Sequence, residues 1–179
     1  IMSLIEQNLT ENGRETEQTL EMLCSVRSDL AAIYIYNDRG KLVDSHTGTH
    51  ELKEHYLKDL SYISLDSYRP GMLYLSEPHV ESLLQDYYPW VVSVLQEITG
   101  ADGQKVRVVI DIRFSKISDY VDDVGIGQHG YCFITDSNGE IIYHPQQQLL
   151  YSGLKTESAE NFDLSSDGSF ETDELICSV

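Results

Sequence analysis

Tyrosine is the residue type in this sequence best suited to binding a small molecule. The chain contains 12 Tyr against one Trp and four Phe. Several rings gather in one stretch, at Tyr68, Tyr74, Tyr87, Tyr88 and Trp90. Rings with a polar tip give a pocket apolar walls and a few fixed hydrogen-bonding groups, which suits a small polar ligand. The alternative is ordinary strand alternation, which would place half of these rings in the core and half on the surface.

No motif in the sequence indicates catalysis. It lacks G-x-S-x-G, H-E-x-x-H and the phosphate-binding loop of nucleotide hydrolases. Gly125, Gly127 and Gly130 have the spacing of a dinucleotide-binding fingerprint. They lie between a predicted helix and a predicted strand, the reverse of the order that such a site requires. We therefore expect no enzyme activity in this chain and no cofactor.

Histidine and glutamate gather at one place in the sequence, at His46, His50, Glu51, Glu54 and His55. Glu51 and His55 are spaced i, i+4, so they would share one face of a helix and could hold a metal ion. A solvated polar helix face has the same composition and spacing. We predict no metal site.

The charge balance excludes several kinds of partner. Among 179 residues there are 12 Lys and Arg against 30 Asp and Glu, a formal net charge of −18. Such a chain repels nucleic acid and anionic membrane surfaces. Hydrophobic residues make up 41% of the sequence, which is enough for a packed core. No apolar run approaches the roughly 18–20 residues that a membrane-spanning helix needs.

A hairpin pattern occurs twice in the sequence. In the first copy, a β-rich run over 31–36 leads into a turn ending at Gly40 and then a second β-rich run. In the second copy, the run over 131–135 leads into a turn ending at Gly139, 99 residues after Gly40. Two β-rich runs joined by a Gly-containing turn are typical of an antiparallel hairpin. The repeat indicates two copies of one module.

The first copy continues into a complete antiparallel module. Its further predicted elements are a short helix over 51–60 and strands over 72–76, 88–99 and 106–112. Five strands with inserted helices form an α+β module. Helical spacing then covers 114–124, where Gly125 and Gly127 end the helix that connects the two modules.

The two ends of the chain complete the predicted organisation. Residues 1–30 lack Pro and carry a thin apolar stripe at helical spacing, which predicts one long stalk helix. The second module contains one further strand-like segment, 169–179, so we expect it to be truncated. The predicted fold class is α+β, with a long N-terminal helix and two antiparallel-sheet modules. The predicted parts are the stalk helix over 1–30, a first module over 31–113, a connecting helix over 114–124 and a second module over 125–179.

Two segments carry a family resemblance. One is Ser76-Glu77-Pro78-His79-Val80, followed by Tyr88-x-Trp90-Val91-Val92-Ser93. The more specific one is Gly127-x-x-Gly130-Tyr131-x-Phe133-Ile134-x-Asp136-x-x-Gly139-x-Ile141-Ile142-x-His144-Pro145. With the order of the modules, these segments resemble the double Cache (tandem PAS-like) extracellular sensor domain of Gram-positive bacterial sensor histidine kinases. The resemblance covers nearly the whole chain.

The resemblance implies a place and a division of roles. The first module would be membrane-distal and hold the ligand, and the second would be membrane-proximal and pass the change to transmembrane helices. One such helix would precede Ile1 and another would follow the missing strands. The domain would lie on the extracellular face of the bacterial cell membrane, as part of a homodimer.

The resemblance also implies binding residues. Many double Cache domains that bind amino acids contain an Arg before an aromatic pair and, later, an Asp. Arg69 and Asp111 match parts of that pattern, whereas Gly71 and Met72 stand where the aromatic pair would be. Arg69 would bind a carboxylate and Asp111 an ammonium group; a helix-capping role is the alternative for Asp111. The ligand-binding residues that we predict are Arg69, Tyr74, Tyr88, Trp90 and Asp111.

The predicted function is non-enzymatic sensing of a small extracellular solute for a histidine kinase. A ligand would favour one closure state of the first module, and the connecting helix would carry that shift to the second. Two alternatives remain open. The chain could be the ectodomain of a chemotaxis receptor or cyclic-dinucleotide enzyme, or a module that contacts a protein or the cell wall and has no small-molecule ligand.

Overall fold

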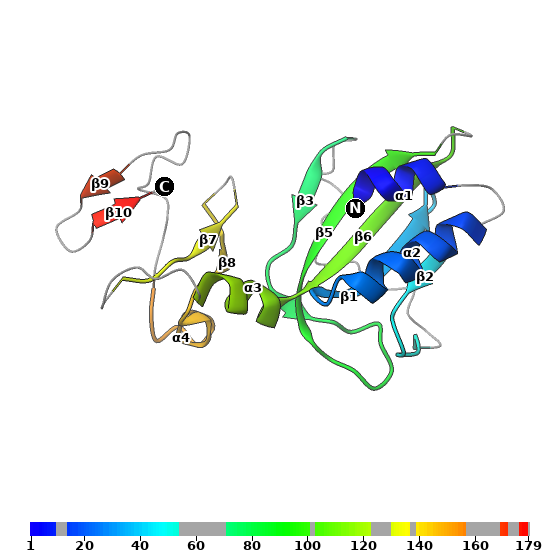
Figure 1. Cartoon of the computed structure of the whole chain (residues 1–179). Coiled ribbons are helices and arrows are strands. Elements are labelled where there is room, and N and C mark those ends of the chain that lie inside the picture. The colour runs from blue at the N-terminus through cyan, green and yellow to red at the C-terminus, as the bar shows by residue number, and fades with distance from the viewer. Residues whose placement is uncertain are drawn as a thin grey trace. The chain divides into compact units, whose positions relative to one another are not determined.

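The computed structural model describes residues 1–9, 14–53, 71–100, 103–122, 130–136, 139–156, 169–171 and 176–178. The chain divides into two units, Ile1–Asp123 and Val124–Val179. Antiparallel strands and short helices make up both units, in agreement with the predicted α+β class. The first unit contains the larger sheet (Figure 1).

The sheet of the first unit is antiparallel throughout. Its order is β2-β1-β6-β5-β3, and β4 also pairs with β5. The strands are β1 (Leu30–Asn37), β2 (Leu42–His46), β3 (Leu73–Leu75), β4 (His79–Val80), β5 (Trp90–Thr99) and β6 (Lys105–Arg113). The strands predicted over 72–76, 88–99 and 106–112 are therefore present as β3, β5 and β6. The two-residue strand β4 was not predicted.

The repeated hairpin is confirmed in both units. β1 pairs with β2, and β7 (Ile134–Thr135) pairs with β8 (Ile141–Tyr143). Gly40 and Gly139 occupy matching turn positions with φ of 74° and 86°, a left-handed conformation that glycine adopts without steric cost. Asn37 Oδ1 and Asp136 Oδ1 each accept the backbone N–H of the residue four positions later, both at 2.9 Å. The same side-chain-to-backbone contact therefore closes both turns.

The N-terminal segment folds as two helices, α1 (Met2–Asn8) and α2 (Arg14–Val26). The prediction of one long helix over 1–30 is therefore wrong. The helix α1 ends at Asn8, because the backbone of the next residue, Leu9, is extended (φ −73°, ψ 107°). The two helices pack against one another and against the sheet. Turning back lets Ile5 of α1 and Leu20 of α2 reach one core, which a straight helix would not allow.

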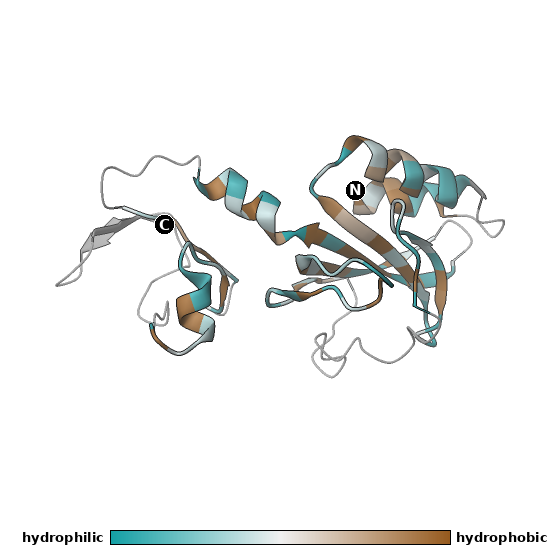
Figure 2. Ribbon diagram, turned by 90° about the horizontal axis from the view of Figure 1, so that it is seen from below, coloured by the Kyte–Doolittle hydropathy of each residue, from teal (hydrophilic) through white to brown (hydrophobic). Residues whose placement is uncertain are grey.

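Each face of the sheet has its own hydrophobic cluster, because side chains alternate along a strand. Both helices lie on one face (Figure 2). The cluster beneath them contains Ile5, Leu9, Leu20, Leu23, Leu30, Ile33, Ile35, Ile98, Val106, Val108 and Ile110. The cluster on the opposite face contains Ala32, Tyr34, Tyr36, Leu83, Leu95 and Val109.

The helix α3 (Phe114–Asp122) follows β6 directly and lies within the range predicted to be helical, 114–124; its connecting role stays a prediction. The second unit also contains α4 (Gln147–Tyr151), β9 (Ser169–Glu171) and β10 (Ile176–Ser178). β9 pairs with β10, so the single strand predicted over 169–179 is wrong: this segment contributes two strands that pair with each other. Most of the helix predicted over 51–60 lies outside the described residues. No helix in the described ranges has the length and apolar character needed to cross a membrane.

Candidate functional site

One face of the six-stranded sheet carries a row of aromatic and apolar side chains. Tyr34 in β1 is in register with Val109 in β6, Val109 with Leu95 in β5, and Leu95 with Tyr74 in β3. Residues directly opposite one another on neighbouring strands share a face of the sheet. Tyr34 is fully buried, and Tyr74, on the edge strand, is half-buried against the same cluster. This row forms the floor of the candidate site.

The next row of the same face is polar and centres on Asp111. Asp111 in β6 is in register with Ala32 in β1 and Ser93 in β5. It is 0% exposed, and the Ser93 hydroxyl donates a hydrogen bond to its Oδ1 at 2.5 Å. Glu81, directly after β4, is 1% exposed and accepts the backbone N–H of Leu83 at Oε1, at 2.5 Å. The sheet therefore holds two buried carboxyl groups, Asp111 and Glu81, which we call the carboxyl pair.

Each carboxyl group of the carboxyl pair has one further oxygen, and both of these oxygens are buried. No donor among the described residues reaches Oδ2 of Asp111 or Oε2 of Glu81. Because both oxygens are acceptors when ionised, a hydrogen bond between the two groups requires a proton on one of them. A proton held between the two groups satisfies them, whereas the ionised pair is left with two buried acceptors, which costs free energy.

Burial is the main cause that raises the pKa of Asp111 well above its ordinary value of 3.8. The hydrogen bond and the charge of the Glu81 carboxyl group raise this pKa further, and the Ser93 hydroxyl lowers it. Two like charges in a dry site disfavour each other's ionisation. While Asp111 holds its proton, the pair carries at most one negative charge, and no Lys or Arg among the described residues is paired with it.

His79 connects the carboxyl pair with the surface. Its Nδ1 lies 3.0 Å from the carbonyl oxygen of Glu77 and 3.2 Å from Ser76 Oγ. Its Nε2 lies 3.4 Å from Ser93 Oγ. Ser76 Oγ also accepts the backbone N–H of Ser93 at 2.8 Å, which fixes the loop before β4 against β5. His79 is partly exposed, whereas Asp111 is not.

The structure brings together two of the five predicted ligand-binding residues. Tyr74 and Asp111 face the same side of the sheet, one row apart, as their register requires. Tyr88 is 55% exposed, donates its hydroxyl to the carbonyl of Gln85 at 2.6 Å, and has Lys53 Nζ 4.9 Å from its ring centre.

Trp90 is 46% exposed and begins β5, three positions before Ser93, so strand alternation places it on the opposite face from Ser93. Arg69 lies outside the described residues, as does Tyr68. Binding by all five residues stays a prediction.

Glu81, His79 and Ser93 were not predicted as site residues. They come together through β4, which pairs with the start of β5 over two residues. The signal available in the sequence was the spacing of His79 and Glu81, which are two positions apart and would therefore share one face of a strand. Among the described residues, no group of three His, Cys, Asp or Glu side chains could hold a metal ion. His55 and Glu54, from the metal alternative, lie outside them.

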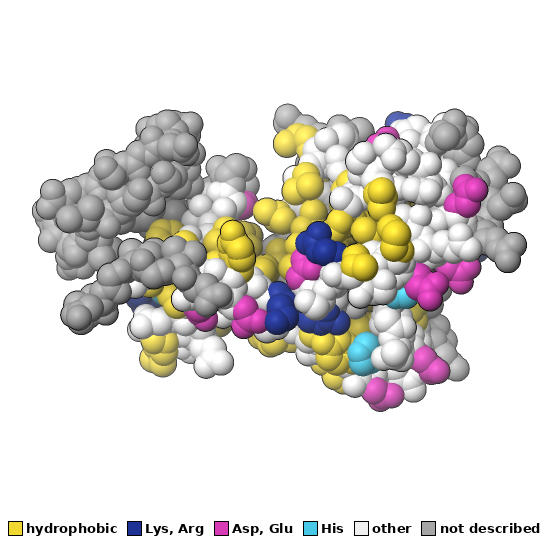
Figure 3. Space-filling view, viewed as in Figure 1, with side chains coloured by type: hydrophobic (Ala, Val, Ile, Leu, Met, Phe, Trp, Pro, Cys, Tyr) yellow, Lys and Arg dark blue, Asp and Glu magenta, His cyan; other side chains and the backbone are white. Residues whose placement is uncertain are grey.

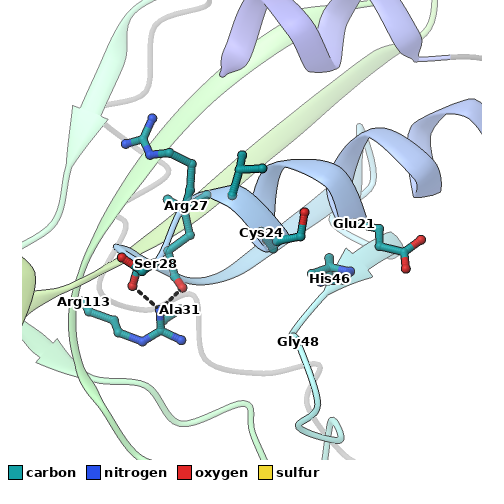
Figure 4. Close-up of a pocket in the computed structure, with 11 residues that line it drawn as sticks. Glu21, Cys24, Arg27, Ser28, Ala31, His46, Gly48 and Arg113 are labelled. Atoms are coloured by element: carbon teal, nitrogen blue, oxygen red, sulfur yellow. Dashed lines mark hydrogen bonds between the residues drawn. The ribbon is translucent and has the colours of Figure 1, made fainter.

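A separate surface pocket of about 590 Å³ lies at the C-terminal end of α2 (Figure 4). Its lining includes Cys24, Arg27, His46 and Arg113. The Arg113 guanidinium donates to the carbonyl oxygens of Ser28, at 2.7 Å, and Leu30. Burial raises the pKa of the Cys24 thiol, which makes this cysteine less reactive than an exposed one. The Arg113 guanidinium is thus hydrogen-bonded to the backbone, and we call this arrangement the Arg113 clamp.

Arg113 is expected to contribute to stability because it joins three segments. Besides the two carbonyl groups, its Nε donates to the Tyr87 hydroxyl at 3.2 Å. Replacing Arg113 with Met should lower the free energy of unfolding by about 1–3 kcal/mol, since partly buried acceptors lose their donors. The matched change Arg39→Met, in the exposed hairpin turn, should stay within about 0.5 kcal/mol of the unmodified chain. Urea unfolding of the two variants measures both values, and equal losses would contradict the clamp.

Comparison with solved structures identifies the same fold in bacterial receptors. The ligand-binding domain of the Pseudomonas fluorescens chemoreceptor CtaA, in complex with L-valine, aligns with a TM-score of 0.61 and 18% identity, over 93% of this chain and 74% of that one. The ligand-binding domain of the Pseudomonas aeruginosa PAO1 amino acid chemoreceptor PctB, in complex with L-Gln, aligns with a TM-score of 0.58 and 20% identity, over 80% of this chain and 58% of that one. At these identities the likeness concerns the fold.

Sequence comparison gives the family. No curated protein matches the chain. The family model of the Cache domain (dCache_1) matches residues 1–174, which is nearly the whole sequence. The match includes the six-stranded sheet with the carboxyl pair and the second unit with its repeated hairpin. The chain therefore belongs to the Cache domain family.

Proposed function

We propose that this chain is the extracytoplasmic ligand-sensing domain of a membrane receptor. In this proposal a small organic cation binds against the sheet face that carries Asp111 and Glu81. The observation that carries the proposal is the carboxyl pair itself, with two buried oxygens that no described donor reaches. An ammonium group placed there would donate to both oxygens and neutralise the pair, and both gains are largest in a buried site.

The neighbouring row of side chains supports an organic ligand over a bare ion. Tyr34, Leu95 and Tyr74 provide ring and aliphatic surface next to the carboxyl pair. Ligand sites commonly combine such apolar walls with a few fixed polar groups. The solved relatives are complexes with L-valine, L-Gln and, for Mlp24, asparagine. All three ligands carry an ammonium group, which supports recognition of that group here.

Whether the ligand must also carry a carboxylate depends on Arg69, which we propose as its partner. Amino acids would then use both charged ends, and simple amines would use the carboxyl pair alone. A comparison of amino acids with amines of equal chain length separates the two classes.

For the parent protein, we propose a sensor histidine kinase on the basis of the two segments around Ser76 and Gly127. The second candidate is a chemotaxis receptor, which the two Pseudomonas chemoreceptor structures favour. Either parent would place the domain outside the cell membrane, between flanking transmembrane helices, and would use it as a non-enzymatic module. The sequence of the complete protein, with its output domain, decides between them.

A protein-contact role has one observation in its favour. Apolar side chains are exposed just before and along β3 and where the end of β4 pairs with the start of β5. Figure 3 shows apolar side chains gathered on the face that carries α1 and β3. These residues are Met72, Leu73, Leu75, Val80 and Trp90. Exposed apolar surface of this kind often marks an interaction site.

A thermal-shift screen of the purified chain tests the ligand proposal. The panel contains amino acids, linear amines, organic acids, sugars and divalent metal ions. A ligand present at about 100 times its Kd adds roughly 2.7 kcal/mol of stability. For a domain of this size the melting temperature should rise by about 5–10 °C. We expect the rise with compounds that carry an ammonium group.

The variant Asp44→Asn is the matched control for Asp111→Asn in this screen. Asp44 is half-buried in β2 opposite Ile35, so its side chain faces the helices and not the carboxyl pair. The shift should persist in Asp44→Asn and vanish in Asp111→Asn. A panel with no response from any class would count against a small-molecule ligand and favour the protein-contact role.

A further inference from the structure

The carboxyl pair is connected to the outside of the protein by a short hydrogen-bonded chain. Asp111 Oδ1 is 2.5 Å from Ser93 Oγ, and Ser93 Oγ is 3.4 Å from Nε2 of the partly exposed His79. We propose that Ser93 and His79 form the route by which the carboxyl pair exchanges its proton with solvent. External pH would then set the charge of the pair. A role of this route in ligand sensing rests on the proposed function.

The surroundings of His79 set the proton positions that this route needs. Nδ1 lies 3.0 Å from the carbonyl oxygen of Glu77, which can only accept a hydrogen bond. In the tautomer that has the hydrogen on Nδ1, toward this carbonyl oxygen, Nε2 is the acceptor that faces Ser93. A neutral His79 is thus arranged to receive a proton from the direction of the carboxyl pair.

The transfer can be written with every proton placed. At rest the Ser93 hydroxyl donates to Asp111 Oδ1. For the transfer, the Asp111 proton moves to Oδ1 and donates to Ser93 Oγ, while the Ser93 O–H turns to donate to His79 Nε2. The Asp111 O–H bond then breaks as Ser93 Oγ takes that proton, while the former Ser93 proton forms an N–H bond at Nε2. The products are an Asp111 carboxylate, a neutral serine and an imidazolium ion. The partly exposed imidazolium releases one ring proton to water, and the reverse sequence recharges Asp111.

The charges around the pair favour a proton as its variable counter-ion. In the described part of the chain, no Lys or Arg forms an ion pair with Asp111 or Glu81. Tyr34 of β1 stands one row away, and Arg113 of β6 directs its guanidinium to Ser28, Leu30 and Tyr87. The titratable groups that face Asp111 are therefore Glu81 and, through Ser93, His79.

The route has a consequence for binding. A protonated pair offers a cation little charge, whereas an ionised pair offers a full carboxylate. If the proposed function is correct, a bound cation displaces the proton through Ser93 and His79, and affinity rises as the external pH rises.

NMR titration of the ligand-free chain, with carbon-13 in carboxyl and imidazole groups, tests the route directly. We expect proton exchange at Asp111, measured by relaxation dispersion of its carboxyl signal near the midpoint of its titration, to be fast in the unmodified chain. His79→Gln and Ser93→Ala should each slow this exchange, because each removes one atom of the route. His46→Gln should leave the exchange rate unchanged, because His46 is paired with Ile33 on the opposite face of the sheet.

An exchange rate at Asp111 that is the same in the unmodified chain, His79→Gln and Ser93→Ala would overturn the proposal. The two variants remove different atoms, so a folding defect in one leaves the other as a test. Because no ligand is present, a failed ligand screen would remove the proposed function and leave this result standing. An unchanged exchange rate would remove the proton route alone.

Discussion

Replacing Asp111 with Asn should abolish the ligand-induced thermal shift and, at neutral pH, make the unliganded protein more stable. The two effects share one cause. The buried carboxyl group of Asp111 is 0% exposed and faces a second carboxyl group, so its ionised form is costly without a bound cation. An amide of the same shape cannot ionise. It can still donate a hydrogen bond to Glu81, as the protonated acid does.

The loss of affinity should be about thirtyfold or more. Removing one partner of a buried, hydrogen-bonded charge pair costs about 2–5 kcal/mol, and each 1.4 kcal/mol is a factor of about ten. Calorimetric titration of the best amine from the screen into both proteins measures this ratio. An unchanged Kd in Asp111→Asn would show that the ligand binds elsewhere.

The gain in stability should depend on pH with a definite sign. The pKa of Asp111 in the folded chain is raised above the ordinary 3.8. Between that value and the raised pKa, the folded state holds a proton that the unfolded state has lost. Stability therefore falls as pH rises through this window, by about 1.4 kcal/mol per pH unit, and levels off above the folded pKa.

Asp111→Asn should lack this decline, so the difference between the two proteins is small near pH 4 and grows toward neutral pH. Urea unfolding at a series of pH values measures it. Asp38→Asn, in the exposed hairpin turn, removes the same charge without removing a buried carboxyl group. Because a net charge of −18 also weakens the folded state as pH rises, this control separates the general effect from the local one. Equal curves for the two variants would contradict the assignment.

Local sequence was sufficient where local interactions determine the structure. The turns at Gly40 and Gly139 are closed by hydrogen bonds within four residues, so their pattern is visible in the sequence. Asp111 was also foreseeable, because it is a charged residue within the apolar run of β6. An ionisable group at the core-facing position of a central strand has to be explained by a partner or a function.

The rest of the candidate site depends on contacts that no local pattern records. Glu81 and His79 reach Asp111 because the two-residue strand β4 pairs with the start of β5. Trp90 begins β5 and Tyr88 lies two residues before it, but strand alternation places Trp90 on the face opposite Ser93, and the Tyr88 hydroxyl donates to the carbonyl of Gln85. Clustering of aromatic residues in sequence does not indicate which side of a sheet they occupy.

The N-terminal helices illustrate the same difference. The gap in apolar residues between Leu9 and Leu20 was interpreted as a thin stripe on one helix. In the structure α1 ends at this gap, and both helices cover the same sheet face. A break in periodicity and a polar stretch of a continuous helix look alike in sequence. The structure distinguishes the two, because α1 and α2 both pack on the same apolar face of the sheet.

Replacing Leu95 with Ala should destabilise the first unit strongly and leave the second unit unaffected. Leu95 is 1% exposed and lies between Val109 and Tyr74 in the floor of the candidate site. Truncating a buried leucine costs about 2–5 kcal/mol, since the cavity is only partly refilled. For a unit of this length the melting temperature should fall by roughly 10 °C. Leu75→Ala, at a position 44% exposed in β3, should have a much smaller effect.

The complementary variant is Ile142→Ala in β8 of the second unit, where Ile142 is 5% exposed. Calorimetry should show that Leu95→Ala and Ile142→Ala lower different transitions, because the two residues belong to units with separate sheets. If both variants lower one shared transition, the units unfold together and α3 couples them energetically. Separate transitions would show that the stability of one unit is independent of the other. A ligand signal would then have to pass through α3 as a change of conformation.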